Sequence, residues 1–148
     1  MPVVNPDAPF RPRRGRAMAI WTGIIATVLS GLIALFLPGP DQGGPWGPVD
    51  RAMVWGLGLG IAALMARFAM IGAWPGPEGL RVRNLMLTQV LPWDEIEDVR
   101  FGGGEPWVDL ELAEGESIAV MAIQRADGDF GVTEAQRLTR LIEERQRA

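Results

Sequence analysis

Four carboxylates crowd one short stretch of the sequence, Asp94, Glu95, Glu97 and Asp98. Paired carboxylates can bind a hard cation such as Mg²⁺ or divide the roles of general acid and general base. Their spacing does not match a calcium-binding loop, and Ile96 between the pairs is typical of a turn that enters a strand. We therefore interpret the cluster as a solvated turn, with a metal or catalytic site as the alternative.

Other catalytic chemistries are missing from the chain. It has no Cys and no His, which excludes a disulfide framework, a thiolate nucleophile, an imidazole base and an imidazole metal ligand. The glycines at 102–104 lack the Lys and Ser or Thr of a phosphate loop, and Asp127-Gly128-Asp129 is typical of a turn. We predict a protein that is not an enzyme and has no cofactor or metal.

The charged residues limit the class of ligand. All 14 basic residues are Arg, against 18 carboxylates, and a net charge of -4 argues against nucleic-acid binding. Arg81 and Arg83 could contact the phosphates of an anionic lipid headgroup. From Gly76 onward, however, the chain holds 8 Arg and 15 Asp and Glu. This acidic balance favours a solvated strand face or a membrane flank for the Arg pair.

Two tryptophans of the C-terminal half could be core residues or anchors for a bound peptide. We predict that Trp93 belongs to the core. Trp107 falls on the polar side of an alternating segment, so it lies either under another segment or in a binding surface. The candidate interaction surface therefore consists of Arg81, Arg83 and Trp107.

These residues follow two long apolar segments. Residues 17–37 carry no charge, and at about 1.5 Å per residue they reach about 30 Å, the thickness of bilayer hydrocarbon. Residues 52–74 carry only Arg67, and the connection at 38–51 is rich in Pro and Gly. We predict a transmembrane hairpin over 17–74. A buried soluble helix and a signal peptide are the alternatives for the first segment, but Pro-Gly-Pro follows it instead of a cleavage site.

Arginine placement predicts the orientation of this hairpin. Four Arg lie in the N-terminal tail at 1–16, and Arg81 and Arg83 follow the second segment. Both termini are therefore expected in the cytoplasm, with the protein a multi-pass component of the inner (plasma) membrane. Four residues are expected at the membrane interfaces, namely Trp21, Trp55, Arg67 and Trp74.

Small residues recur every four positions on each apolar segment. The first carries Ala19, Gly23, Thr27 and Gly31, and the second Ala52, Gly56 and Gly60. Such faces let helix backbones approach closely. We expect them to pair within one molecule, although they could also form a homo-oligomer.

The remaining residues, 75–148, change to brief runs with period-two alternation. About five antiparallel strands are predicted, at 79–83, 87–91, 96–101, 107–112 and 117–123. Thr133 and Gln136 form a capping-box pattern, after which Leu138, Leu141 and Ile142 form the apolar stripe of a C-terminal helix. That helix is expected to cover the open sheet.

Several landmarks of this region occur in a recognisable order. They are Gly79-Leu80-Arg81-Val82-Arg83-Asn84, Leu91-Pro92-Trp93-Asp94-Glu95-Ile96, Pro106-Trp107, and Ala122-Ile123-Gln124-Arg125-Ala126-Asp127-Gly128. Over about half the chain, this series resembles the bacterial PH-like domain of the low molecular weight protein antigen 6 family. The resemblance implies a small pleckstrin-homology-like barrel or sandwich closed by the C-terminal helix. It implies no catalytic residues.

The predicted fold class is an α+β membrane protein, with a two-helix transmembrane hairpin before an antiparallel PH-like barrel or sandwich and a capping helix. The expected function is a non-catalytic docking or scaffolding module for an unknown protein partner, held at the lipid bilayer. The alternative is an anionic lipid-headgroup sensor that uses Arg81 and Arg83.

Overall fold

The computed structural model describes residues 5–148, which form two compact units. One unit, Ala17–Ala69, holds the two long helices. The other combines the N-terminal segment up to Arg16 with Met70–Ala148. The segment predicted as a basic N-terminal tail thus groups with the C-terminal residues, and the unit resumes at Met70 and not at residue 75.

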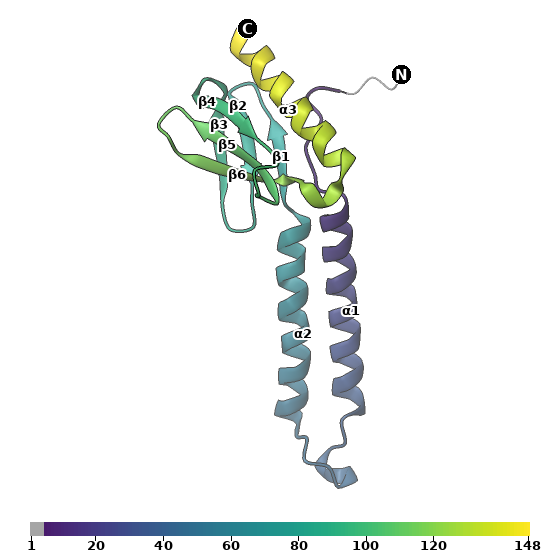
Figure 1. The fold of residues 1–148 in the computed structure, drawn as a ribbon. Helices are drawn as coiled ribbons and strands as arrows, with labels where there is room; N and C mark the ends of the chain where they lie inside the picture. The colour runs from purple at the N-terminus through teal and green to yellow at the C-terminus, as the bar shows by residue number, and fades with distance from the viewer. Residues whose placement is uncertain (1–4) are drawn as a thin grey trace. The chain divides into compact units, whose positions relative to one another are not determined.

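In the helical unit, α1 (Arg14–Phe36) and α2 (Pro48–Ala69) run side by side in opposite directions (Figure 1). A short 3-10 helix, η1 (Pro40–Gln42), lies in the loop between them. Both helices are long and apolar enough to cross a membrane, with mean hydropathies of 2.1 and 1.6. Only 17% and 6% of their apolar windows are buried, so most of their large apolar side chains face outward.

The helices differ in their bounds from the predicted 17–37 and 52–74. Helix α2 begins at Pro48 because proline suits the first helical position and Asp50 caps the start, its Oδ2 accepting from the N–H of Gly47 at 2.7 Å. It ends at Ala69 because the next residues pair with a strand. Trp74 therefore lies in a strand and not at a helix end.

The two helices meet through small residues, and partly through different ones from those predicted. On α1, Ala19 and Gly23 are buried, as the small-residue face suggested. On α2 the contact uses Gly58, where an added Cβ would overlap with the hydroxyl of Ser30. An added Cβ on Gly56 or Gly60 would meet nothing within 4 Å, so this predicted face is open. Gly58 forms the contact between α1 and α2 because the buried Ser30 lies opposite it.

The other unit contains two antiparallel three-stranded sheets. Sheet A is formed by β1 (Gly72–Pro75), β2 (Gly79–Arg83) and β3 (Thr88–Pro92), and sheet B by β4 (Ile96–Arg100), β5 (Trp107–Leu112) and β6 (Ser117–Gln124). The five predicted strands are present, and β1 is an addition. Short 3-10 helices, η2 (Trp93–Glu95) and η3 (Arg125–Asp127), follow β3 and β6.

The C-terminal helix α3 (Asp129–Arg147) packs against this core (Figure 1). Leu138, Leu141 and Ile142 are buried, which confirms the predicted apolar stripe. The predicted capping box at Thr133 is wrong, because Thr133 lies inside the helix and its Oγ1 donates to the carbonyl of Asp129 at 2.9 Å. The helix starts earlier because Gly128, with a φ of 59°, takes a backbone conformation that few other residues adopt.

The N-terminal segment is built into the same core. Phe10 is fully buried, and it forms an isolated antiparallel bridge with Ala73 through hydrogen bonds of 2.8 and 3.0 Å. The segment thereby pairs with the edge of β1 that β2 leaves free. We call residues 5–13 the N-terminal strap.

Candidate functional site

The predicted carboxylate cluster does not form a shared binding site. Asp94 and Glu95 belong to η2, Glu97 and Asp98 to β4, and all four are exposed. Among the residues that the structure describes, no group of three or more His, Cys, Asp or Glu could hold a metal ion. The geometry therefore gives this cluster no shared ligand position.

The outer face of sheet A brings the predicted Arg pair together with an aromatic ring. Arg81 pairs with Trp74 on β1 and with Val90 on β3, and directly paired residues point to the same side of a sheet. Arg83 lies two residues along the same strand, hence on the same side, and its Nη2 lies 3.6 Å from the sulfur of Met70. Sheet A thus presents two guanidinium groups beside an indole ring.

A third arginine joins this face from the strap. The guanidinium carbon of Arg11 lies 5.9 Å from the centre of the Trp74 ring, within reach of a cation–π interaction. We call Arg11, Trp74, Arg81 and Arg83 the basic face. Strand alternation predicted that the two strand arginines share a side, whereas no local pattern shows that the strap returns to β1.

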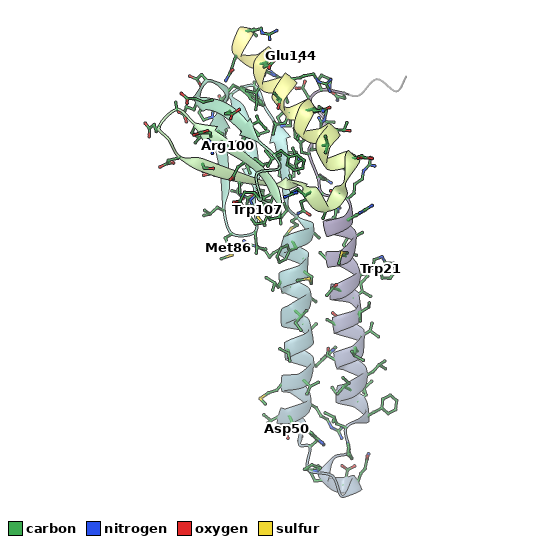
Figure 2. All side chains as sticks on the ribbon, in the orientation of Figure 1. Trp21, Asp50, Met86, Arg100, Trp107 and Glu144 are labelled. Atoms are coloured by element: carbon green, nitrogen blue, oxygen red, sulfur yellow. The ribbon has the colours of Figure 1, made fainter. Side chains whose placement is uncertain are left out.

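The hairpin between β2 and β3 carries apolar side chains outward. Met86 is 78% exposed and Leu87 is 68% exposed, and Figure 2 shows Met86 at the tip of this hairpin. Asn84 fixes its base: Nδ2 donates to the carbonyl of Ala119 at 2.7 Å, and Oδ1 accepts from the N–H of Met121 at 3.1 Å. The exposed tip therefore belongs to a loop that is tied to sheet B.

Sheet B presents a surface of the opposite charge. Along β5, Val108, Leu110 and Leu112 are buried, so Trp107 and its alternating neighbours point outward. Those neighbours are acidic, and we call the set Asp98, Trp107, Asp109 and Glu111 the acidic face. Asp98 joins it because it pairs with Glu111 across β4 and β5.

One cation opposes these carboxylates on the same two strands. Arg100, labelled in Figure 2, donates from Nη2 to Oε2 of Glu111 at 2.5 Å and lies 3.9 Å from Asp98. Arg100 and Asp98 are both 64% exposed, so water screens their attraction. Trp107 is half-buried, which leaves part of its ring accessible beside the carboxylates.

The two tryptophans thus differ as the sequence suggested. Trp93 is buried, and its Nε1 donates to the carbonyl of Gly76 at 2.9 Å, which satisfies its one polar atom. Its assignment to the core is confirmed. Trp107 takes the outward position that the alternation of β5 indicates.

The strap and α3 line an open cavity of about 520 Å³. At its wall, the guanidinium of Arg137 lies 3.7 Å from the centre of the Phe10 ring and forms two hydrogen bonds with Glu134, at 2.7 and 3.0 Å. Arg137 also donates to the carbonyls of Pro6 and Ala8. The chain itself accepts these hydrogen bonds, so Arg137 at the wall of the cavity holds the strap in place.

Asp127 has a role that the turn pattern did not reveal. Its two carboxylate oxygens accept from the N–H groups of Arg13 and Arg14, at 2.9 and 2.8 Å, where α1 begins. A carboxylate in this position caps a helix N-terminus. Because this capping residue lies more than a hundred residues away in the sequence, no local sequence pattern predicts it.

The residues predicted at the membrane interfaces lie in different elements. Trp21 is 64% exposed on α1 and Trp55 is 50% exposed on α2, and Figure 2 shows the side chain of Trp21 projecting from its helix. Arg67 lies in the last turn of α2. Trp74 lies in β1 under Arg11.

Comparison with known proteins agrees with this architecture. A family model described as "Bacterial PH domain" matches residues 76–141. Uncharacterized proteins of Mycobacterium tuberculosis and Mycobacterium bovis are 35% identical over 119 residues, which cover 76% of this chain and 77% of the relatives. No solved structure matches the chain significantly.

The similarity to the mycobacterial proteins is longer than the family-model match, so it includes residues that precede Gly76. The narrower assignment to the low molecular weight protein antigen 6 family stays a prediction. The fold, with two antiparallel sheets and a covering C-terminal helix, agrees with the family match and with these relatives. The chain belongs to the bacterial PH domain family.

Proposed function

We propose that this protein is anchored in the inner membrane by its helical hairpin, with both termini in the cytoplasm. The support is the length and hydropathy of α1 and α2 together with their outward apolar side chains, which in water would form an unusually large exposed patch. The Arg residues of 11–16 and the later Arg81 and Arg83 favour this orientation.

The anchoring is tested by fractionation and by reporter fusions. The full-length protein should sediment with membranes in ultracentrifugation without detergent, and a reporter fused after Ala148 should be active in the cytoplasm. Recovery in the supernatant would overturn the anchoring. Activity of a periplasm-specific reporter at the same position would overturn the orientation.

Within this arrangement, the PH-like unit acts as a non-catalytic docking module for another protein. The observation that carries this proposal is the acidic face, where Trp107 is partly accessible and is followed along the same side of β5 by Asp109 and Glu111. Accessible aromatic rings anchor protein interfaces, and surrounding charges select the partner. The partner that fits is a protein with a basic contact surface.

The docking is tested by cross-linking in cells followed by affinity purification in mild detergent. A reproducible companion should be recovered with the unaltered protein and lost from the charge-reversed variant Asp98→Lys/Asp109→Lys. The matched control is Glu114→Lys/Glu116→Lys, which makes the same charge change on the exposed β5–β6 turn and should retain the companion. Recovery of the tethered protein alone, or equal loss from both variants, would contradict docking at the acidic face.

A second candidate function is an anionic lipid-headgroup sensor that uses Arg81 and Arg83. It is favoured by the basic face, where Arg11 adds a third guanidinium, and by the exposed Met86 and Leu87 on the adjoining hairpin. Several cations suit a phosphate-bearing surface, and apolar side chains beside them can enter the bilayer boundary.

The absence of Cys allows a direct test of the lipid sensor. Met86→Cys, labelled with an environment-sensitive fluorophore in the full-length protein, should show a blue-shifted emission in nanodiscs with phosphatidylglycerol. The shift should weaken with added salt and with Arg81→Glu/Arg83→Glu, while a label at Glu114→Cys should not respond. Equal emission in zwitterionic and anionic nanodiscs would discard this function.

A further inference from the structure

The helical hairpin contains a cavity of its own, of about 370 Å³. It lies between the last turns of α1 and the first turns of α2, at the loop end of the hairpin. Its lining is apolar except for two side chains, and consists of Gly31, Ala34, Leu35, Arg51, Ala52 and Trp55.

The guanidinium of Arg51 is incompletely satisfied at this cavity. Nη2 donates to the carbonyl of Leu37 at 2.7 Å, but the buried Nε has no hydrogen-bond partner. Among residues 5–148, no carboxylate lies within ion-pair distance of Arg51. The neighbouring Asp50 is engaged elsewhere, because its Oδ2 accepts from Gly47. A buried donor without an acceptor is costly, and an unbalanced charge more so.

Trp55 brings a second donor to the same wall, one helical turn after Arg51. An added Cβ on Gly31 would lie 3.1 Å from the indole Nε1, so the edge of the indole ring packs closely against this glycine. No acceptor for Nε1 is found within the described chain. The cavity thus combines a guanidinium group and an indole N–H with apolar walls.

We propose that this cavity binds the phosphate group of a glycerophospholipid, with the guanidinium group of Arg51 and Trp55 Nε1 donating to its oxygens. Guanidinium groups bind phosphate through charge-assisted hydrogen bonds, and basic pockets between membrane helices hold lipid headgroups. Leu35 and Ala34 suit the start of an acyl chain. Arg51 lies three residues after the first residue of α2, which puts it about 4.5 Å from the helix start, at headgroup depth.

The inference rests on the proposed membrane anchoring, and it differs from the lipid sensor in its location. With both termini in the cytoplasm, the loop end of the hairpin meets the periplasmic leaflet. The bound lipid therefore belongs to the outer leaflet of the inner membrane, whereas the basic face would contact the cytoplasmic leaflet. Free phosphate offers the same oxygens but no acyl chain, so it should bind much more weakly.

The test measures lipid binding by native mass spectrometry of the full-length protein, delipidated in mild detergent. Added phosphatidylglycerol should bind with a defined stoichiometry, while diacylglycerol, which lacks the phosphate, and inorganic phosphate alone should not. Trp55→Phe, which removes one N–H and keeps the ring, should weaken binding about threefold to tenfold, and Arg51→Gln by more than tenfold. Trp21→Phe is the matched control outside the cavity and should bind as the unaltered protein does.

A further variant keeps the inference testable if Arg51→Gln does not fold. Ala34→Leu should exclude the lipid by filling the cavity while Arg51 stays in place. Equal binding of phosphatidylglycerol and diacylglycerol, competition by inorganic phosphate alone, or unchanged binding in both Trp55→Phe and Ala34→Leu would overturn the inference. Sedimentation with membranes reports on the anchoring separately, so failure of either idea is recognisable.

Discussion

Sheets A and B have similar inner faces and opposite outer ones. Both contribute fully buried aliphatic side chains to one core, such as Leu80 and Val82 from β2 and Val108 and Leu110 from β5. Outward, sheet A carries arginines around Trp74, and sheet B carries carboxylates around Trp107. A net charge for the whole chain hides this division. The comparison teaches that two small sheets on one core can present outer faces of opposite charge.

The two sheets also differ in the segments that pair with their edge strands. The free edge of β1 in sheet A is bridged by Phe10 of the strap, whose ring lies beneath the guanidinium of Arg137. The strands of sheet B follow one another through short turns and pair only with neighbours in sequence. The free edge of sheet A is therefore paired with a distant segment, whereas the strands of sheet B pair only with one another.

The largest effect is expected from removing the contact between the strap and sheet A. Phe10→Ala removes a fully buried ring and should lower the free energy of unfolding of the PH-like unit by about 3–5 kcal/mol. Hydrogen exchange of the full-length protein in detergent should accelerate more in β1 than in β5. Phe36→Ala, at an 81% exposed ring, is the control and should leave both strands unchanged. Equal acceleration in the two sheets would show that the strap supports the whole core.

Removal of the distant helix cap should have the next largest effect. Asp127→Ala leaves the N–H groups of Arg13 and Arg14 without their acceptor and should destabilise the unit by about 2–3 kcal/mol. Chemical denaturation followed by circular dichroism measures the change. Asp129→Ala, at an exposed position two residues later, is the matched control. A comparable loss in both variants would assign the effect to helix α3 and not to the strap.

The link between the two sheets is tested by Asn84. Asn84→Ala removes both hydrogen bonds to β6 and should cost about 2 kcal/mol, at about 1 kcal/mol for each bond. Asn84→Asp keeps the acceptor for Met121 but places a carboxylate oxygen against the carbonyl oxygen of Ala119, so in urea denaturation it should be at least as destabilised as Asn84→Ala. A stability of Asn84→Asp close to that of the unaltered protein would show that the bond to Ala119 does not join the sheets.

The smallest effect concerns the exposed ion pair of sheet B. A double-mutant cycle of Arg100→Ala and Glu111→Ala should give a coupling energy of about 0.2–1 kcal/mol, because the pair is screened by water. The coupling should fall further in high salt. A value well above this range would mean that Arg100 neutralises the acidic face more strongly than its exposure suggests.

Local periodicity predicted much of this fold from the sequence. Alternation located β2 to β6, and the spacing of Leu138, Leu141 and Ile142 located the buried side of α3. Strand β1 was missed because Gly72–Pro75 continues an apolar segment of helical length, and only pairing with β2 and Phe10 makes it a strand.

The candidate surfaces were predicted less completely, for the same reason. Alternation placed Arg81 and Arg83 on one side of their strand and turned Trp107 outward. The contributions of Arg11 and Asp127 depend on contacts between segments far apart in the chain. Such contacts leave no spacing pattern in a single sequence.

The strap also sets an order of events during synthesis. Phe10 is made more than a hundred residues before Asp127 and Arg137, which hold the strap. Until they emerge, the bridge between Phe10 and Ala73 lacks the contacts that hold the strap in place, so an unfinished chain presents a less protected β1 edge. A ribosome stalled shortly before Asp127 should therefore carry a nascent chain whose first residues a protease can still cut.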